Sequence, residues 1–364
     1  MKVICTQENL KNGLQTVSRI ITTSNTLPIL NNVLLKTEHG LLTLSATNLE
    51  IGITTQIRCK VEIDGAVCLP AKTLSDLVSS LPNSTITLEV ENNGVSIKTD
   101  RYFTLLKSLP SEDFPLIPKI EEGLVIRIGP ETLKSAFEQV IFAVSTNETQ
   151  PEISGVYVLP GTDSLKLVAT DRYRLAEKTL AIKTSGSSGV IIPHRAAAEL
   201  SRIMANTKVE VEITITENQV AMVVGETHLV SRLIDGQYVD YEQIVPTSFN
   251  TEVIVSKNQL ANALKTTGIF SGGVQSVRLE FISENQTIKV ASGAQELGES
   301  TVEVPCEIHG PDGVVIFNHR YILDCLQVIP EDEILFKFIN DVSPAVITPK
   351  TKQDYRYLVM PIKS

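Results

Sequence analysis

The feature that most constrains the fold of this chain is a threefold internal repeat. The segments KVICTQENLKNGLQTVSRI, VIRIGPETLKSAFEQVIFAV and VIVSKNQLANALKTTGIF share a strand-then-helix pattern. A second set is GAVCLPAKTLSDLVSSL, GVIIPHRAAAELSRIM and GVVIFNHRYILDCLQVI, whose leading glycines Gly65, Gly189 and Gly313 lie at equal intervals of 124 residues. This period is too long for the stacked small units of a solenoid, so the sequence predicts three duplicated domains.

The helical part of each repeat carries one apolar face. Apolar residues recur there at i, i+4 and i+7, which is the spacing of a half-buried helix. The corresponding residues of the first two repeats are Leu10, Leu14 and Val17, and Leu133, Phe137 and Val140. Pro130 followed by Glu131 suits a first helical turn, and Ser256 with Gln259 forms a capping-box pattern.

Short alternating runs such as LLTLSATNLEIGITTQI and ITLEVENNGVSIKT surround these helices and are typical of antiparallel strands. Asn92-Asn93-Gly94 and Glu217-Asn218 are the residues that tight hairpin turns favour. Each repeat is therefore expected to be an α+β domain of two helices packed on about eight antiparallel strands. Polar, proline-containing segments at 118–123 and 246–250 are the expected linkers, which predicts domains at residues 1–122, 123–248 and 249–364.

The chain is acidic as a whole, but its predicted helices carry more basic than acidic residues. The formal net charge is −10, with 42 acidic and 32 basic residues, and this acidity alone argues against nucleic acid as a partner. The predicted helices nevertheless carry a basic surplus of nine to six, which would suit DNA if they lined one surface; ordinary solvated helix faces explain it equally well. The basic residues are Lys11, Arg19, Lys72, Lys134, Arg195, Arg202, Lys257, Lys265 and Arg320, and the acidic ones Glu8, Asp76, Glu131, Glu138, Glu199 and Asp324.

Motifs for catalysis and cofactor binding are missing from the sequence. It has no P-loop, no GxGxxG, no HExxH and no GxSxG, and its five histidines are dispersed. Its five cysteines form no CxxC pair, so we expect buried, reduced thiols and no metal site. The chain has no apolar run long enough to cross a bilayer and no signal peptide at its start. We expect a cytoplasmic protein with no cofactor and no membrane partner.

The strongest enzyme-like cluster is the run from Thr170 to Arg174, TDRYR. A catalytic carboxylate needs a raised pKa, and the two arginines beside Asp171 would lower it instead. An ion-paired strand end or a binding surface is the favoured interpretation, and a hydrolase that uses Asp171 is the minor alternative.

Three motifs, together with the repeat, resemble one known family. They are TLPILNNVLL at 26–35 followed by LSATNLEIGI, LVATDRYRLA at 167–176, and YLVMPIKS at 357–364. The chain resembles the bacterial DNA polymerase III beta subunits, which are sliding clamps and processivity factors of replication. The resemblance covers essentially the whole chain.

The resemblance implies a head-to-tail homodimer that closes into a six-domain ring around duplex DNA. The helices would line the hole, and the sheets would form the outer wall. The implied partners are double-stranded DNA, bound without sequence preference, the polymerase catalytic subunit, the clamp loader and other proteins with a clamp-binding motif. No enzymatic activity is implied. The alternative is a repeat-built scaffold that never encircles DNA, which would not explain the paired TDRYRLA and VMPI motifs.

The resemblance also implies a pocket for partner peptides, an apolar cleft with a few polar groups. Carried over by position, its residues are Ile153, Thr170, Arg172, Tyr173, Arg174, Leu175, Val239, Gln243, Ile244, Asn318, Tyr321, Ser343, Pro344, Val346, Leu358, Val359, Met360, Pro361 and Ile362. The chain departs from the family at four of them. Gly-His is usual where it has Arg172-Tyr173, and Pro and Arg are usual where it has Val239 and Gln243.

Further positions follow from the resemblance. Phe103 and Leu105 match family residues that pack at the ring joint against the counterparts of Ile269 and Phe270. An ordinary core role is the alternative for these four residues. The loop positions that touch DNA in the family correspond to Ser24, Asn147 and Pro151, so basic or aromatic contacts are not expected there.

Overall fold

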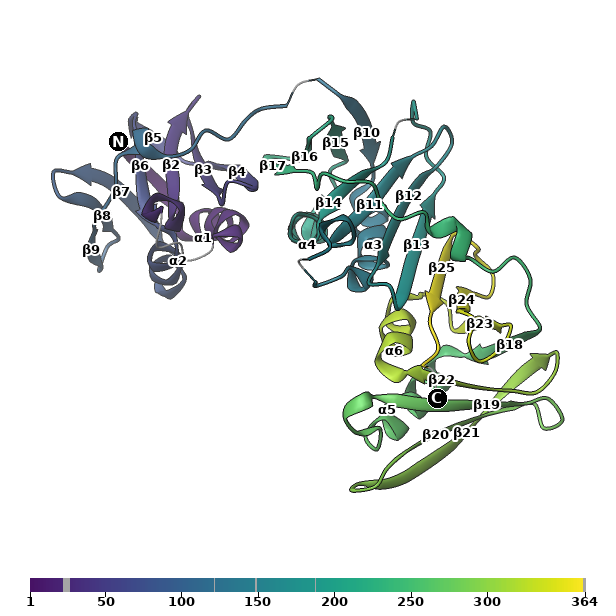
Figure 1. Cartoon of the computed structure of the whole chain (residues 1–364). Helices are drawn as coiled ribbons and strands as arrows, with labels where there is room; N and C mark the ends of the chain where they lie inside the picture. Colours follow the sequence, from purple (N-terminus) through teal and green to yellow (C-terminus); the bar gives the residue numbers. More distant parts are fainter. Residues whose placement is uncertain (22–26, 121, 148, 187, 363–364) are drawn as a thin grey trace. The chain divides into compact units, whose positions relative to one another are not determined.

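The computed structural model describes residues 1–21, 27–120, 122–147, 149–186 and 188–362. This part of the chain contains six α-helices and 25 strands, and every strand pairing within its sheets is antiparallel (Figure 1). The helices and strands recur in the order that the repeat predicts, two helices in each copy, which confirms the α+β fold. The chain divides into two compact units, residues 1–134 with 198–233, and residues 135–197 with 234 onward.

The first compact unit contains a five-stranded and an eight-stranded sheet. The five strands, in spatial order, are β5 (Lys60–Ile63), β1 (Lys2–Thr6), β7 (Thr85–Glu91), β8 (Gly94–Lys98) and β9 (Phe103–Leu106). The eight are β10 (Leu124–Ile128), β15 (Val211–Ile215), β16 (Gln219–Val224), β17 (Thr227–Arg232), β4 (Ile51–Arg58), β3 (Leu41–Thr47), β2 (Asn32–Glu38) and β6 (Ala66–Pro70). Because β17 pairs with β4, one sheet continues from the first repeat into the second.

Helices α1 (Gln7–Val17) and α2 (Ala71–Ser80) pack against each other, and α1 also packs on β4. The hydroxyl of Thr6 caps α1 by accepting a hydrogen bond from the N–H of Asn9. The three residues of the predicted apolar face of α1 are fully buried. Gly13 allows the close approach to β4, since a Cβ there would lie 2.9 Å from Cγ2 of Ile57.

The second compact unit is built on a twelve-stranded sheet. Its strands, in spatial order, are β14 (Val190–Pro193), β11 (Gly155–Pro160), β12 (Leu165–Thr170), β13 (Arg174–Leu180), β25 (Tyr355–Val359), β24 (Ala345–Pro349), β23 (Glu333–Phe338), β18 (Thr251–Ser256), β21 (Gly298–His309), β20 (Thr287–Ala294), β19 (Ser276–Ile282) and β22 (Gly313–Asn318). Strand β13 of the second repeat pairs with β25 of the third, so this sheet also continues across a repeat boundary.

Helices α5 (Lys257–Gly268) and α6 (His319–Val328) pack together in the second unit. The predicted cap of α5 is confirmed, because the Ser256 hydroxyl accepts from the N–H of Gln259 at 3.5 Å. Helices α3 (Pro130–Glu138) and α4 (His194–Ile203) each contribute residues to both compact units. Helix α3 begins at Pro130 as predicted, and its apolar residues Leu133 and Phe137 are buried.

The turns and connecting segments agree with the sequence pattern. Asn92 and Asn93 form the two-residue loop of the β7–β8 hairpin, and Gly94 follows at a φ of 146°. The described parts of 118–123 and 246–250 contain no helix or strand. The domain boundaries drawn through these segments remain a prediction.

All five cysteines are free, as expected, but only three are buried. Cys5, Cys68 and Cys325 lie in the core, and burial raises the pKa of the Cys5 thiol to about 12. Cys59 and Cys306 are half-buried, so the expectation of complete burial is wrong for these two. Cys59 lies between β4 and β5, and Cys306 lies on the inward-facing side of β21 but is only partly covered.

Candidate functional site

The turn between β12 and β13 is held by its own side chains. Oδ1 of Asp171 accepts hydrogen bonds from the N–H groups of Tyr173 and Arg174, both at 3.0 Å. The Thr170 hydroxyl donates to the carbonyl oxygen of Arg174 at 2.7 Å and accepts from the N–H of Arg172 at 3.1 Å. This arrangement holds Arg172 at a φ of 78°, in the left-handed region that costs a residue with a Cβ about 1–2 kcal/mol.

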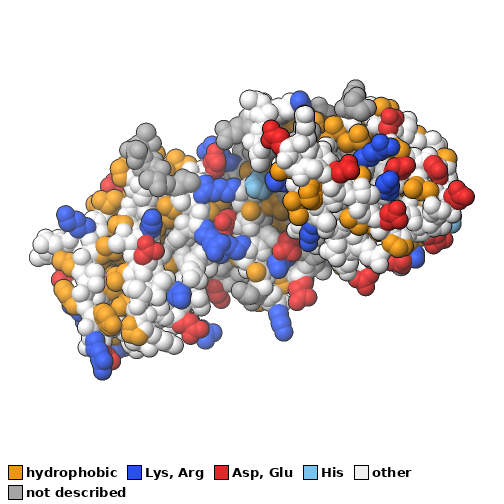
Figure 2. All heavy atoms as spheres, turned by 90° about the horizontal axis from the view of Figure 1, so that it is seen from below, with side chains coloured by type: hydrophobic (Ala, Val, Ile, Leu, Met, Phe, Trp, Pro, Cys, Tyr) orange, Lys and Arg blue, Asp and Glu red, His pale blue; other side chains and the backbone are white. Residues whose placement is uncertain are grey.

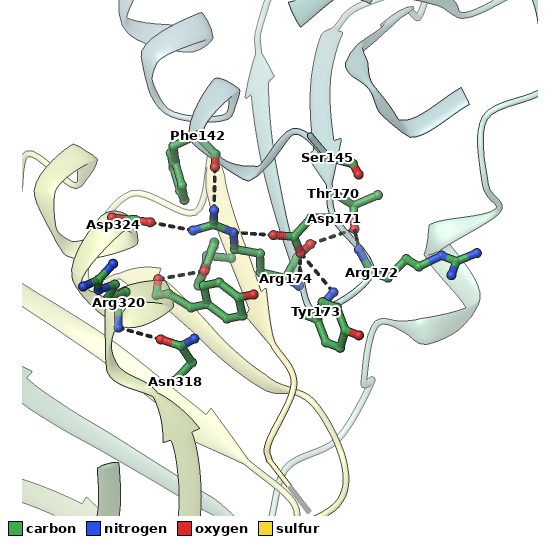
Figure 3. A network of polar contacts seen from close by, with 12 residues as sticks. Phe142, Ser145, Thr170, Asp171, Arg172, Tyr173, Arg174, Asn318, Arg320 and Asp324 are labelled. Carbon is green, nitrogen blue, oxygen red and sulfur yellow. Dashed lines mark hydrogen bonds and ion pairs between the residues drawn. The ribbon is translucent and has the colours of Figure 1, made fainter. Parts of the chain in front are cut away.

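Arg174 is the centre of the polar network in Figure 3. Its Nε donates to Oδ2 of Asp171 at 2.9 Å, and its Nη1 donates to Oδ2 of Asp324 at 2.6 Å. Its Nη2 donates to the carbonyl oxygen of Phe142 at 2.8 Å. The guanidinium carbon also lies 4.5 Å from the centroid of the Tyr321 ring. The planar group is therefore satisfied on its edges and on one face.

The electrostatics of the network keep Arg174 charged. Burial opposes the charge, but Tyr357, Asp324 and Asp171 outweigh it and raise the pKa of Arg174 above its ordinary value. Both carboxylate oxygens of Asp171 are already engaged, one by backbone N–H groups and one by the guanidinium. The carboxylate therefore acts as a structural partner within the turn.

A pocket of about 260 Å³ opens beside this turn. Its walls come from the turn itself, from the segment that includes the 3₁₀ helix η7 (Tyr241–Ile244), and from the C-terminal strand β25. Ile153, Leu175 and Leu358 are buried at its base and belong to one core cluster. The fifteen lining residues are Gln150, Glu152, Ile153, Thr170, Arg172, Tyr173, Arg174, Leu175, Val239, Asp240, Tyr241, Ile244, Pro344, Leu358 and Met360.

Eleven of the nineteen residues assigned to the partner pocket by resemblance line this one cavity. They come from segments far apart in the sequence, and the fold brings them together. These residues are Ile153, Thr170, Arg172, Tyr173, Arg174, Leu175, Val239, Ile244, Pro344, Leu358 and Met360. The backbone contributes as well, because the N–H of Met360 donates to the carbonyl oxygen of Tyr173 at 2.8 Å.

Eight assigned residues do not line the cavity. Val346 and Val359 are buried in the core, and Tyr321 packs on the Arg174 guanidinium. Gln243 is exposed, and its Nε2 donates to Oδ2 of Asp240 at 2.7 Å. The other four are Asn318, Ser343, Pro361 and Ile362.

These last four residues lie at or near the ends of strands β22, β24 and β25. The Asn318 side chain caps α6 by accepting from the N–H of Arg320 at 3.0 Å. The N–H of Ser343 donates to Oδ1 of Asn340 at 2.7 Å, and the N–H of Ile362 donates to the carbonyl oxygen of Ile316 at 2.8 Å. Pro361 is half-buried between Met360 and Ile362.

Four lining residues were not found from the sequence, namely Gln150, Glu152, Asp240 and Tyr241. Each is next to or near an assigned residue in the chain, but no motif marks it. The Tyr241 side chain is buried, and burial together with the nearby Glu177 raises its pKa above the ordinary value. Its place in the run VDYEQI was the only available signal.

An ion-pair cluster holds η7, one wall of the pocket, to the sheet. Oε1 of Glu242 accepts from Nζ of Lys166 on β12 at 2.9 Å, and Oε2 accepts from Nη2 of Arg356 on β25 at 3.2 Å. The same Nη2 lies 2.8 Å from Oε2 of Glu177 on β13, whose side chain is buried. The hydrogen bond from Lys166 and the charge of Arg356 hold the pKa of Glu242 below its ordinary value.

The nine basic residues predicted to face DNA all lie on helices. Arg19 is on the 3₁₀ helix η1 (Ser18–Ile20), and the other eight are on α1 to α6. Arg202 pairs with Glu199 at 2.8 Å, and Nζ of Lys257 donates to the carbonyl oxygen of Ile329 at 2.7 Å, so these two are partly engaged within the protein. On the face drawn in Figure 2, basic side chains are interspersed with acidic and apolar ones. A DNA-facing role for the nine remains a prediction.

The four residues assigned to the ring joint are not core residues. Phe103 and Leu105 are 64% and 45% exposed on β9, an edge strand of the five-stranded sheet. Ile269 is 70% exposed just after α5, and Phe270 is half-buried. Large apolar side chains exposed in this way favour an interface over the core alternative.

Two of the three loop positions matched to DNA contacts of the family lie in a turn and at the start of a 3₁₀ helix. Oδ1 of Asn147 accepts from the N–H of Thr149 at 3.0 Å, and Pro151 begins the 3₁₀ helix η5 (Pro151–Ile153). Ser24 lies outside the described residues.

Within the described residues, no helix is long and apolar enough to span a membrane, and no group of three or more His, Cys, Asp or Glu side chains could hold a metal ion.

Comparison with known families matches the chain in three consecutive parts. Residues 1–118 match the family described as DNA polymerase III beta subunit, N-terminal domain. Residues 127–240 match its central domain, and residues 242–363 match its C-terminal domain. The matches follow one another in chain order and together cover nearly the whole sequence.

Individual relatives agree over their full length. The beta sliding clamp of Synechococcus elongatus is 32% identical over 372 residues, which covers 100% of this chain and 99% of that protein. The beta sliding clamp of Pseudomonas aeruginosa is 30% identical over 362 residues, covering 98% of each. Among solved structures, the P. aeruginosa sliding clamp bound to griselimycin superposes with a TM-score of 0.95 at 29% identity and covers 100% of both chains. The beta subunit of Thermotoga maritima gives a TM-score of 0.94 at 26% identity, covering 100% of this chain and 99% of that one.

Proposed function

The chain belongs to the family of DNA polymerase III beta subunits, and from this premise we propose that two copies close head to tail into a six-domain ring around duplex DNA. Its function is that of a sliding clamp, a processivity factor that tethers the polymerase to DNA during replication. The observation that carries this function is the match of all three family domains, in order, to a chain aligned end to end with beta sliding clamps.

Exposed apolar residues support ring closure at an edge strand. Phe103 and Leu105 project from β9, whose outer edge has no strand partner among the described residues. Unpaired edges of this kind are templates for pairing with another chain, and a closed ring removes them. Ile269 and Phe270 of a second copy are the proposed partners. The domains of the ring are residues 1–122, 123–248 and 249–364.

The proposed lining of the ring is the set of six helices with their nine basic residues. Phosphate contacts carry no sequence information, so such a lining retains DNA and lets the ring move along it. The acidic total of the chain would then reside mainly in strands and loops, away from the duplex.

The proposed partner site is the pocket beside the 170–174 turn. It combines an apolar base with polar groups at its mouth, which is the composition of a site for short peptide segments. Its partners would be the polymerase catalytic subunit, the clamp loader and other proteins that carry a clamp-binding motif. Deletion of residues 360–364 removes Met360 from the wall and should abolish peptide binding while the dimer stays intact. Loss of the dimer in this variant would contradict that division of roles.

We propose that the protein has no catalytic activity, needs no cofactor and acts in the cytoplasm. The engagement of Asp171 by Arg174 and two backbone N–H groups supports a structural role for the most enzyme-like residue. Loading onto DNA would then require a separate ATP-driven loader.

The experiment that tests encirclement compares circular with linear DNA. The protein is loaded by its own organism's clamp loader onto nicked circular duplex, and bound protein is measured by gel filtration before and after one restriction cut. Retention on the circle and loss from the cut molecule is the expected result. Equal retention on both would favour a scaffold bound to the surface of DNA.

A further inference from the structure

Arg172 differs from the other arginine of the turn, because its guanidinium makes no hydrogen bond or ion pair with the part of the chain that the structure describes. Its side chain is exposed at the mouth of the pocket, and only its backbone N–H makes a hydrogen bond within the described residues. Figure 3 shows it pointing away from Asp171, Arg174 and Asp324. Arg174, in contrast, is satisfied by two carboxylates and a carbonyl oxygen. The charge of Arg172 is therefore available to a molecule that enters the pocket.

The backbone at Arg172 is in the left-handed region. A φ of 78° suits glycine, and any residue with a Cβ is strained there. The turn would form more easily without the arginine side chain, because its hydrogen bonds are made by Thr170, Asp171 and backbone groups. The corresponding turn of the first repeat has the same backbone, with Leu49 at a φ of 75°. The strain therefore belongs to the repeated turn, and the exposed charge of Arg172 is what distinguishes the turn beside the pocket.

We propose that Arg172 binds an acidic side chain of partner segments whose apolar side chains occupy the pocket; this rests on the proposed partner site. A guanidinium presents parallel N–H donors that match the two oxygens of a carboxylate. The other cation of the lining, Arg174, is already paired with Asp171 and Asp324. Arg172 is thus the charge in the lining that favours an acidic peptide over a neutral one.

The two carboxylates of the lining limit where an acidic side chain can bind. Glu152 and Asp240 also line the pocket, and Oδ2 of Asp240 accepts from Nε2 of Gln243. These two carboxylates repel an acidic side chain placed near them. The acidic residue of the segment is therefore expected beside Arg172 and not beside Glu152 or Asp240.

Fluorescence anisotropy with paired peptides tests the proposal. The probes are labelled eight-residue peptides with Leu and Phe as apolar residues, in which each other position is Asp in turn and is matched by an Asn twin. With the unaltered protein, at least one Asp peptide should bind about threefold more tightly than its twin, the scale of an exposed ion pair. In Arg172→Gln this ratio should fall to about one, and in the unaltered protein it should shrink with added salt.

A matched variant separates the local effect from a change in total charge. Arg278→Gln removes the same charge from β19, outside the pocket lining, and should keep the preference of the unaltered protein. Equal binding of every Asp and Asn pair, or a preference that survives Arg172→Gln, would overturn the proposal while leaving the pocket in place. Absence of binding by all the peptides would instead count against the partner site itself.

Discussion

Nη1 of Arg174 lies 2.6 Å from Oδ2 of Asp324, a contact between residues 150 positions apart. It joins the start of β13 in the second repeat to α6 in the third, immediately beside the candidate pocket. The pocket therefore lies where the second and third repeats meet. Arg174 both joins these repeats, through Asp324, and lines the pocket.

Arg174→Ala should lower the free energy of unfolding by about 3 kcal/mol, because it leaves the Asp171 carboxylate without its charged partner in a half-buried position. Urea titration followed by circular dichroism measures the change. Asp324→Ala should cost less, since the Asp324 side chain is 39% exposed. A larger loss from Asp324→Ala than from Arg174→Ala would contradict this ranking.

Arg172→Gly should stabilise the protein by about 0.5 kcal/mol. Relief of the left-handed strain, about 1–2 kcal/mol, outweighs the extra entropy that glycine has in the unfolded chain. Arg172→Ala is the control, because it removes the same charge but keeps a Cβ at a φ of 78°. Equal melting temperatures for the glycine and alanine variants would show that the turn is not strained.

Peptide affinity should fall when the pH drops below about 4.5, the ordinary pKa of a glutamate. Lys166 and Arg356 lower the pKa of Glu242 in the folded protein. The stabilisation that ionised Glu242 gives is therefore fully present above its pKa in the unfolded chain, and it is lost as the pH falls through its lower pKa in the folded protein. Protonation then removes the ion pairs of Glu242 with Lys166 and Arg356, which help to hold η7 to the sheet. Anisotropy titrations from pH 7 down to about 3 measure this effect, and Glu242→Gln should bind about twofold more weakly at pH 7 with a flatter profile. An unchanged profile in that variant would exclude Glu242 as the titrating group.

Phe103→Asp should convert the dimer into a monomer, because it places a charge at the centre of the proposed joint. Light scattering after gel filtration gives the mass of the particle. Leu116→Asp is the matched control, since Leu116 is 93% exposed and lies outside the proposed joint. A monomer with the control, or a dimer with Phe103→Asp, would place the joint elsewhere.

The repeat and its periodicity predicted most of the fold. Leu10 and Leu14 are buried where the helical spacing puts them, and the cap at Ser256 forms as its pattern indicates. The joining of sheets through β17–β4 and β13–β25 could not be predicted in this way. Strand alternation identifies the buried face of a strand, but the neighbour across a repeat boundary is chosen by tertiary packing.

The candidate site was predicted less completely than the fold. Family positions near the 170–174 turn meet in one cavity. Val359 points to the other face of β25 from Leu358, since consecutive side chains of a strand point to opposite faces. Val346 pairs with Leu358 across the sheet and lies in the core cluster at the base of the pocket. The role of Glu242 and Arg356 was invisible in the sequence because the two residues are 114 positions apart. The strain at Arg172 was visible only as a departure from the glycine usual in the family.

Electron microscopy of the purified protein in negative stain, without DNA, tests the central claim most directly. Two chains closed head to tail should appear as rings with a hole wide enough for duplex DNA. Compact or elongated particles without a hole, at a concentration where light scattering shows a dimer, would contradict the ring and leave only the three repeated domains.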